Sequence, residues 1–152
     1  MIEIRTGFFE TNSSSVHALI IPKDTRISIP KSVHLRFDDY GWENEQEPDT
    51  LSYLYTACVN RGQKEVDKLM AYLKRKGVED ITTSSGTDCW GIDHSGEVPL
   101  EELFSNENLL DRFCFGLDSY VQLGNDNISF EEEEVSEDNY DPDKYDVLMK
   151  YN

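Results

Sequence analysis

The 152-residue chain has few cysteines, few basic residues and no long apolar run. Its three cysteines are an odd number without close spacing, which argues against a disulfide framework and fits a reducing compartment. No apolar run is long enough to span a bilayer, and the start of the chain, which carries Glu3 and Arg5, lacks the apolar core of a signal peptide. We therefore expect a cytoplasmic protein that contacts no membrane.

Metal-ligand motifs are also scarce. Cys89 and His94 are separated by four residues and stand beside Asp88 and Asp93, but no second ligand pair accompanies them, so packing is favoured over a metal site. Cys58 falls on the apolar face of an expected helix and is interpreted as a core thiol. The sequence predicts reduced cysteines, no bound metal and no cofactor.

The scarcity of basic residues is uneven along the chain. The net charge is −17, from 14 Lys and Arg against 31 Asp and Glu. Residues 1–37 and 50–79 each carry more bases than acids, whereas residues 80–152 carry nineteen acids and three bases. Such a charge repels nucleic-acid backbones and attracts basic protein surfaces. Two interpretations stay open: the acids only keep the protein soluble, or they mimic nucleic acid and compete for a groove lined by Lys and Arg.

The densest acidic run spans residues 131–146, with nine acids and one lysine. Blocks of like charge stay solvated, which makes this run the candidate surface for a basic partner. Four consecutive glutamates open it: Glu131, Glu132, Glu133 and Glu134.

Hydrophobic periodicity predicts the secondary structure. The first third alternates as strands do, and in residues 33–37 the alternation directs His34 to solvent, which argues against a metal or catalytic role for it. Helical spacing starts after Thr50, which can cap a first helix, and Gly62 separates it from a second helix that ends at residues 74–77. The other expected strands are 2–5, 16–21, 26–29, 78–83, 120–123 and 128–130, with a turn at 84–86, a helix over 99–115 and a short helix over 145–151.

This pattern predicts a single α+β domain over residues 1–152. Its opening antiparallel strands (1–37) form one sheet, and the helical pair (50–76) packs on one face of that sheet. Residues 80–152 are the acidic half, which ends in an acidic C-terminal segment.

The segment from Arg5 to His17 carries the densest chemistry in the chain. It places a guanidinium, a carboxylate, an amide, several hydroxyls and an imidazole within thirteen residues, on the connection between two expected strands. Asn and Ser are also ordinary turn residues, so one interpretation is purely structural, with His17 a satisfied strand residue.

The other interpretation is phosphodiester chemistry. His17 has the unperturbed pKa of a general acid or base, Glu10 can pair with it, and Arg5 can hold a phosphate by two parallel hydrogen bonds. A serine nucleophile activated by His17 is a further possibility, because Ser15 and His17 share one face of a strand. The remaining candidates donate hydrogen bonds to phosphate oxygens: Asn12, Ser13, Ser14 and Ser15.

This segment resembles the N-terminal sequence shared by a group of anti-CRISPR proteins. They are carried by plasmids, other conjugative elements and phages of Gram-positive bacteria and act against type II-A Cas9. The matching residues are Arg5, Gly7, the run from Phe9 to Ser15, and His17, and the resemblance covers about the first twenty residues. It implies a protein of the bacterial host cytoplasm that inhibits Cas9, in at least some members by truncation or loss of the guide RNA.

Three hypotheses follow for the function. In the first, the chain binds Cas9, or the Cas9–guide RNA complex, through its acidic surface and its N-terminal motif promotes guide RNA cleavage. In the second, the chain is a passive mimic that occludes a basic groove of Cas9. In the third, it is a mobile-element enzyme unrelated to CRISPR.

Overall fold

Strand β2 (Val16–Pro22) is the centre of a three-stranded antiparallel sheet in the computed structural model, which describes residues 16–40, 48–124 and 139–150. Its neighbours are β5 (Tyr120–Gly124) on one side and β6 (Tyr145–Lys150) on the other. All residues of β2 after Val16 are buried. This agrees with its nearly continuous apolar sequence, because a central strand covered on both faces has no solvent side.

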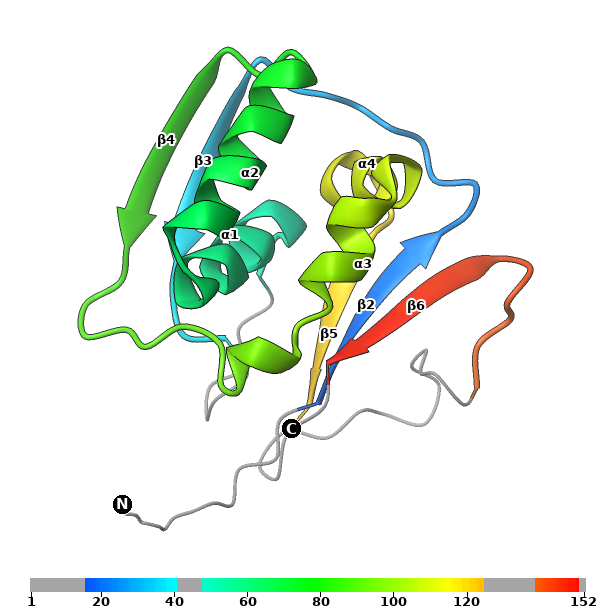
Figure 1. Cartoon of the computed structure of the whole chain (residues 1–152). Coiled ribbons are helices and arrows are strands. Elements are labelled where there is room, and N and C mark those ends of the chain that lie inside the picture. The colour runs from blue at the N-terminus through cyan, green and yellow to red at the C-terminus, as the bar shows by residue number, and fades with distance from the viewer. Residues whose placement is uncertain (1–15, 41–47, 125–138, 151–152) are drawn as a thin grey trace, which may run out of the picture.

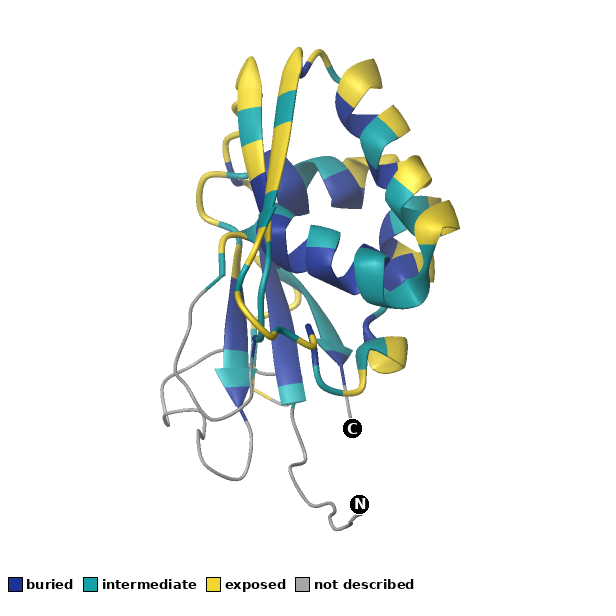
Figure 2. Cartoon of the chain, turned by 90° about the vertical axis from the view of Figure 1, so that its left-hand side faces the viewer, coloured by how far each residue is buried: buried dark blue, intermediate teal, exposed yellow. Residues whose placement is uncertain are grey.

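A second sheet contains two parallel strands, β3 (Ser32–Phe37) and β4 (Asp80–Ser85). Parallel neighbours need a crossover connection, which helices α1 (Thr50–Arg61) and α2 (Gln63–Arg75) supply. Figure 1 shows these helices beside the two-stranded sheet, and Figure 2 shows the two-stranded sheet along one side of the domain with the helices along the other. The chain is therefore an α+β domain, as expected.

The edge of β3 away from β4 is satisfied by α1. Arg36 N–H donates to Ser52 Oγ at 3.0 Å, and Thr56 Oγ1 donates to the Arg36 carbonyl at 3.2 Å. In this strand Leu35 is buried while His34 and Arg36 are exposed, which confirms the predicted alternation.

Capping residues set the ends of the helices. Asp49, not Thr50, caps α1, because its Oδ1 accepts from Ser52 N–H at 2.8 Å. The expected helix over 99–115 is two helices, α3 (Leu100–Ser105) and α4 (Glu107–Phe115), which follow the short 3-10 helix η1 (Ser95–Glu97). Asn106 divides α3 from α4 and caps α4, since its Oδ1 accepts from Leu109 N–H at 3.2 Å.

The core lies between the helices and the three-stranded sheet. The dark blue of Figure 2 follows β2 and the inner faces of the helices. Cys58 and Cys114 are buried within this core, so Cys58 is the core thiol that its helical position predicted. Other fully buried side chains include Leu19, Ile21, Leu54, Leu69, Tyr72, Leu73 and Phe113.

Several expected elements are corrected by the structure. The opening strands do not share a sheet, because β2 and β3 belong to different ones. Residues 26–29 form no strand and contribute only an isolated bridge between Ile27 and Gly116. Ser84 and Ser85 end β4 instead of forming a turn, and residues 145–150 form strand β6 instead of a helix. The expected strands at 2–5 and 128–130 lie outside the described residues.

None of the described helices has the length and apolar character that crossing a membrane requires.

Candidate functional site

Of the residues in the N-terminal motif that the sequence analysis singled out, the structure describes His17 alone. Arg5, Glu10 and the four residues from Asn12 to Ser15 lie outside the described residues, as do Glu131, Glu132, Glu133 and Glu134. Their predicted convergence and partner binding therefore stay predictions.

His17 lies in β2 and its side chain is fully buried. Across the sheet its Cα pairs with Leu123 on β5 and with Lys150 on β6. Its Nδ1 shares a hydrogen bond of 2.8 Å with the hydroxyl of Tyr53, a buried residue of α1, and the two rings meet edge to face with centroids 5.5 Å apart. The imidazole thus connects the central strand to the first helix.

Burial and, to a smaller extent, the positive charge of Lys150 together lower the pKa of His17 to about 3. The imidazole is consequently neutral near pH 7. A general acid or base works best with a pKa near the working pH, so this environment suits a neutral hydrogen-bonding imidazole better than one that exchanges protons.

Lys150 is the second buried titratable group of this region. Burial lowers the pKa of its ammonium to about 8, and the nearby carboxylates of Asp93 and Glu97 act in the opposite direction. Burial also raises the pKa of Asp93. His17, Tyr53, Lys150 and Asp93, from here on the His17 cluster, therefore bring an imidazole, a phenol, an amine and a carboxylate to one end of the three-stranded sheet.

A second polar arrangement was missed in the sequence. On the exposed side of β3, His34 Nδ1 lies 2.8 Å from Thr82 Oγ1 and His34 Nε2 lies 2.7 Å from Ser84 Oγ, both on β4. With the Ser84 hydroxyl donating to Nε2 and the Nδ1 proton donated to Thr82, the three groups form a serine, a base and a group that orients the base. Only the register of β3 against β4, which pairs His34 with Thr82, brings them together.

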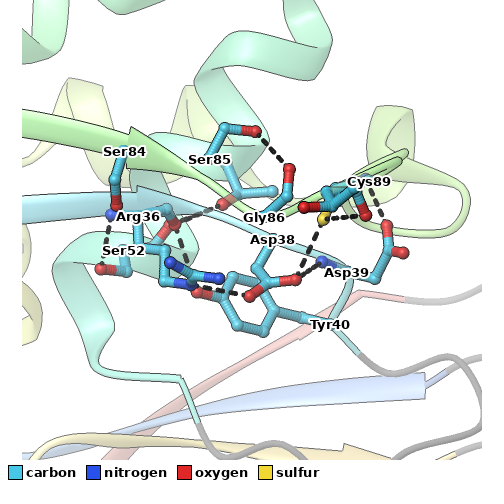
Figure 3. A network of polar contacts seen from close by, with 12 residues as sticks. Arg36, Asp38, Asp39, Tyr40, Ser52, Ser84, Ser85, Gly86 and Cys89 are labelled. Atoms are coloured by element: carbon cyan, nitrogen blue, oxygen red, sulfur yellow. Dashed lines mark hydrogen bonds and ion pairs between the residues drawn. The ribbon is translucent and has the colours of Figure 1, made fainter.

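Beyond the end of β3, Asp38 connects that end of the strand to the loop that carries Cys89 (Figure 3). Its Oδ2 accepts from Arg36 Nε at 2.8 Å, and its Oδ1 accepts from Asp39 N–H at 2.8 Å and from Cys89 Sγ at 3.2 Å. Burial and the neighbouring Asp38 carboxylate raise the pKa of the Cys89 thiol, so Cys89 stays protonated. Three or more metal-ligating side chains do not come together anywhere in the described part of the chain.

Comparisons with known proteins do not identify the chain: no protein-family model, curated protein or solved structure matches it.

Proposed function

We propose that this protein inhibits Cas9 by binding the effector, or the effector with its guide RNA, through an acidic surface, and that binding leads to truncation or loss of the guide RNA. The observation that carries the proposal is the net charge of −17, with nineteen acids and three bases from residue 80 onward. Cas9 holds its guide and target in positively charged channels, to which such a surface is complementary.

The ion pairs of the described residues support the binding part. At least eight of the basic side chains have an acidic partner within this chain, so the positive charge of these side chains is largely cancelled. The acids in excess therefore dominate the electrostatic field of the protein. The pairs are Lys23–Asp146, Lys31–Glu79, Arg36–Asp38, Arg61–Glu101, Lys68–Glu65, Arg75–Glu107, Lys76–Asp111 and Arg112–Asp146.

The guide RNA part rests on the motif from Arg5 to His17. His17 Nε2 is buried and has no hydrogen-bond partner among the described residues, and buried polar atoms are normally paired. The other residues of the motif directly precede His17 in the sequence. This supports a role for His17 Nε2 as one wall of a polar pocket that the motif forms. In that pocket Arg5 would hold a phosphate and Glu10 would complement His17.

The burial and lowered pKa of His17 favour the passive alternative, in which the motif is architecture and the acidic surface alone occludes a basic groove. The two alternatives differ in what happens to the RNA. An occluding mimic leaves the guide intact, whereas the proposed mechanism shortens or removes it.

The test incubates the purified protein with a type II-A Cas9 and end-labelled guide RNA, and follows complex formation, RNA length and target-DNA cleavage. We expect binding, a shortened or lost guide, and no DNA cleavage. A Glu10→Ala, His17→Ala double variant that still binds but leaves the guide intact supports the motif as the active part. Intact guide with the parent protein, together with blocked DNA cleavage, selects the passive mimic, and absence of binding rejects both.

A second candidate function is favoured by the hydrogen bonds of His34. Its 2.7 Å contact with Ser84 Oγ and its 2.8 Å contact with Thr82 suit transfer of an acyl group, in an enzyme unrelated to CRISPR. Ser84 Oγ would bond to the carbonyl carbon of an ester while His34 Nε2 takes the serine proton. His34 would pass this proton to the departing alkoxide, which leaves as the alcohol. Water would then hydrolyse the acyl-serine, which releases the acid and restores the Ser84 hydroxyl.

Ser85 offers a matched control for this candidate, because it is the adjacent serine and its hydroxyl donates instead to the Gly86 carbonyl. With p-nitrophenyl acetate, the enzyme hypothesis predicts acetylation of Ser84 that His34→Gln abolishes and Ser85→Ala leaves unchanged, as read by mass spectrometry of peptides. Equal labelling of the two serines excludes it.

A further inference from the structure

Trp90 lies on the connection between β4 and η1, and 77% of its surface is exposed to solvent. The other exposed large apolar side chains among the described residues, such as Leu117 at 57%, are more covered. Tryptophan is usually among the more buried residues of a protein, and the exposed ring of Trp90 offers a large apolar area that the other described residues leave uncovered.

The backbone around Trp90 is held by two side chains. Asp39 Oδ1 accepts from Trp90 N–H at 2.6 Å and from Gly91 N–H at 2.9 Å. Asn60 Nδ2 donates to the Trp90 carbonyl at 2.9 Å, and Asn60 Oδ1 accepts from Ile92 N–H at 2.9 Å. Four hydrogen bonds thus connect three successive loop residues to α1 and to the end of β3.

Gly91 makes this arrangement possible. Its φ is +93°, a conformation that other residues rarely adopt, and a Cβ there would overlap the side chain of Asn60. The loop is therefore ordered before any partner arrives. A side chain presented on a fixed backbone loses less conformational freedom on binding than one on a mobile loop, which improves affinity.

The charge around Trp90 indicates what it can bind. Residues 86–97 contain Asp88, Asp93 and Glu97 and no Lys or Arg, and Asp38 and Asp39 lie against this loop. Two arginines also lie beside it, but each is paired with a carboxylate: Arg36 with Asp38 and Arg61 with Glu101. A nucleic-acid strand that stacks on an aromatic ring also needs cations for its phosphates, which this loop does not offer. A second copy of the chain would bring another net charge of −17, which would be repelled by this surface. A basic protein surface fits best, because an arginine can stack on the indole while the carboxylates balance its charge.

We propose that Trp90 is the anchor of a docking surface for a basic protein, whose arginine side chains pack on the indole ring. The identity of that protein as Cas9 rests on the proposed function. Interface anchors of this kind are enriched in Trp and carry a large share of the binding energy, while their neighbours mainly exclude water. The surface adds a specific contact to the diffuse attraction of the acidic half.

The test measures the affinity of full-length protein for the Cas9–guide RNA complex by biolayer interferometry, for the parent, Trp90→Ala and Leu117→Ala. Trp90→Ala is expected to weaken binding by about thirtyfold or more, whereas the matched control, an exposed apolar residue on the α4–β5 connection, is expected to change it by less than about threefold. Circular dichroism and the unfolding midpoint check that both variants are folded.

A second readout uses fluorescence. Trp42→Phe leaves Trp90 as the sole tryptophan, and burial against the partner is expected to change its emission intensity and shift its maximum. If the parent binds, but Trp90→Ala binds with the same affinity and the fluorescence spectrum does not shift, the role of Trp90 as an anchor is rejected and the proposed function is not. If the parent does not bind Cas9 at all, the proposed function is rejected, and the anchor with it. Self-association of the parent that Trp90→Ala abolishes would replace the basic partner by a second copy.

Discussion

The burial of His17 predicts that the protein loses stability when the pH falls from 7 to 5. The pKa of this imidazole is about 3 in the folded chain and 6.5 when it is free of the fold. Between these values the unfolded chain binds a proton that the folded chain does not, so acid favours unfolding. Integrating this difference gives a loss of about 2 kcal/mol in the free energy of unfolding at pH 5, with almost none of it present at pH 7.

Urea unfolding at the two pH values measures this loss. Carboxylates also titrate in acid, so the informative quantity is the difference between the parent and His17→Gln, which keeps a polar group but cannot titrate. The parent is expected to lose about 2 kcal/mol more than the variant between pH 7 and pH 5. His17→Phe serves as a second non-titrating variant that fills the buried site.

His34→Gln is the matched control, because it removes an exposed imidazole and leaves the His17 cluster intact. It is expected to behave as the parent does. If His17→Gln and His17→Phe both lose as much stability in acid as the parent, the imidazole is not sealed between β2 and α1, and the argument from its burial is wrong.

Three further predictions concern the packing of the domain. Asn60→Ala removes two hydrogen bonds to backbone groups of the Trp90 loop and is expected to lower the free energy of unfolding in urea by about 1–3 kcal/mol, and an unchanged midpoint would contradict a role of Asn60 in holding this loop. Gly91→Ala is expected to destabilise more than Gly77→Ala, because both have positive φ but only Gly91 lacks space for a Cβ; equal midpoints would show that the loop yields. Cys58 and Cys114 are buried, and burial raises the pKa of both thiols, so a thiol reagent is expected to modify them only after unfolding, and fast labelling of the folded protein would refute this.

The local pattern of the sequence was sufficient to predict α1, α2, β2, β3 and β5. In each, periodicity and an end signal agree: Leu54 and Cys58 follow the helical repeat that Gly62 ends, and Leu35 alternates with exposed neighbours. Such signals depend on residues that are only a few positions apart, and the helices and strands that they predict are present in the structure.

Elements that depend on distant partners were not predictable in this way. Residues 145–150 have an apolar spacing that fits a helix, yet they pair with β2 along its open edge, and the bonds of the sheet outweigh a short and ambiguous pattern. β2 and β3 were expected together because they are adjacent in sequence. Instead β2 pairs with strands that lie about a hundred or more residues later, as in His17 with Lys150.

In the candidate site, too, local features were predictable from the sequence and contacts between distant residues were not. The sequence showed that His34 faces solvent, but not that Thr82 and Ser84 lie opposite it, because strand register is a property of the folded sheet. It also drew attention to His17 as a chemically active residue, without any signal for the Tyr53 and Lys150 that surround it. The backbone of Trp90 is held by hydrogen bonds to Asp39 and Asn60, which are 51 and 30 residues away in the sequence.

The measurement that tests the central claim most directly is the affinity of the full-length protein for a type II-A Cas9–guide RNA complex as a function of salt. We predict binding that weakens steadily as the salt concentration rises, because acidic and basic surfaces attract less when screened. A variant with Glu131, Glu132, Glu133 and Glu134 changed to Gln is expected to bind more weakly and with a shallower salt dependence. Binding that is absent, or that is equally strong at all salt concentrations in both proteins, would contradict the account.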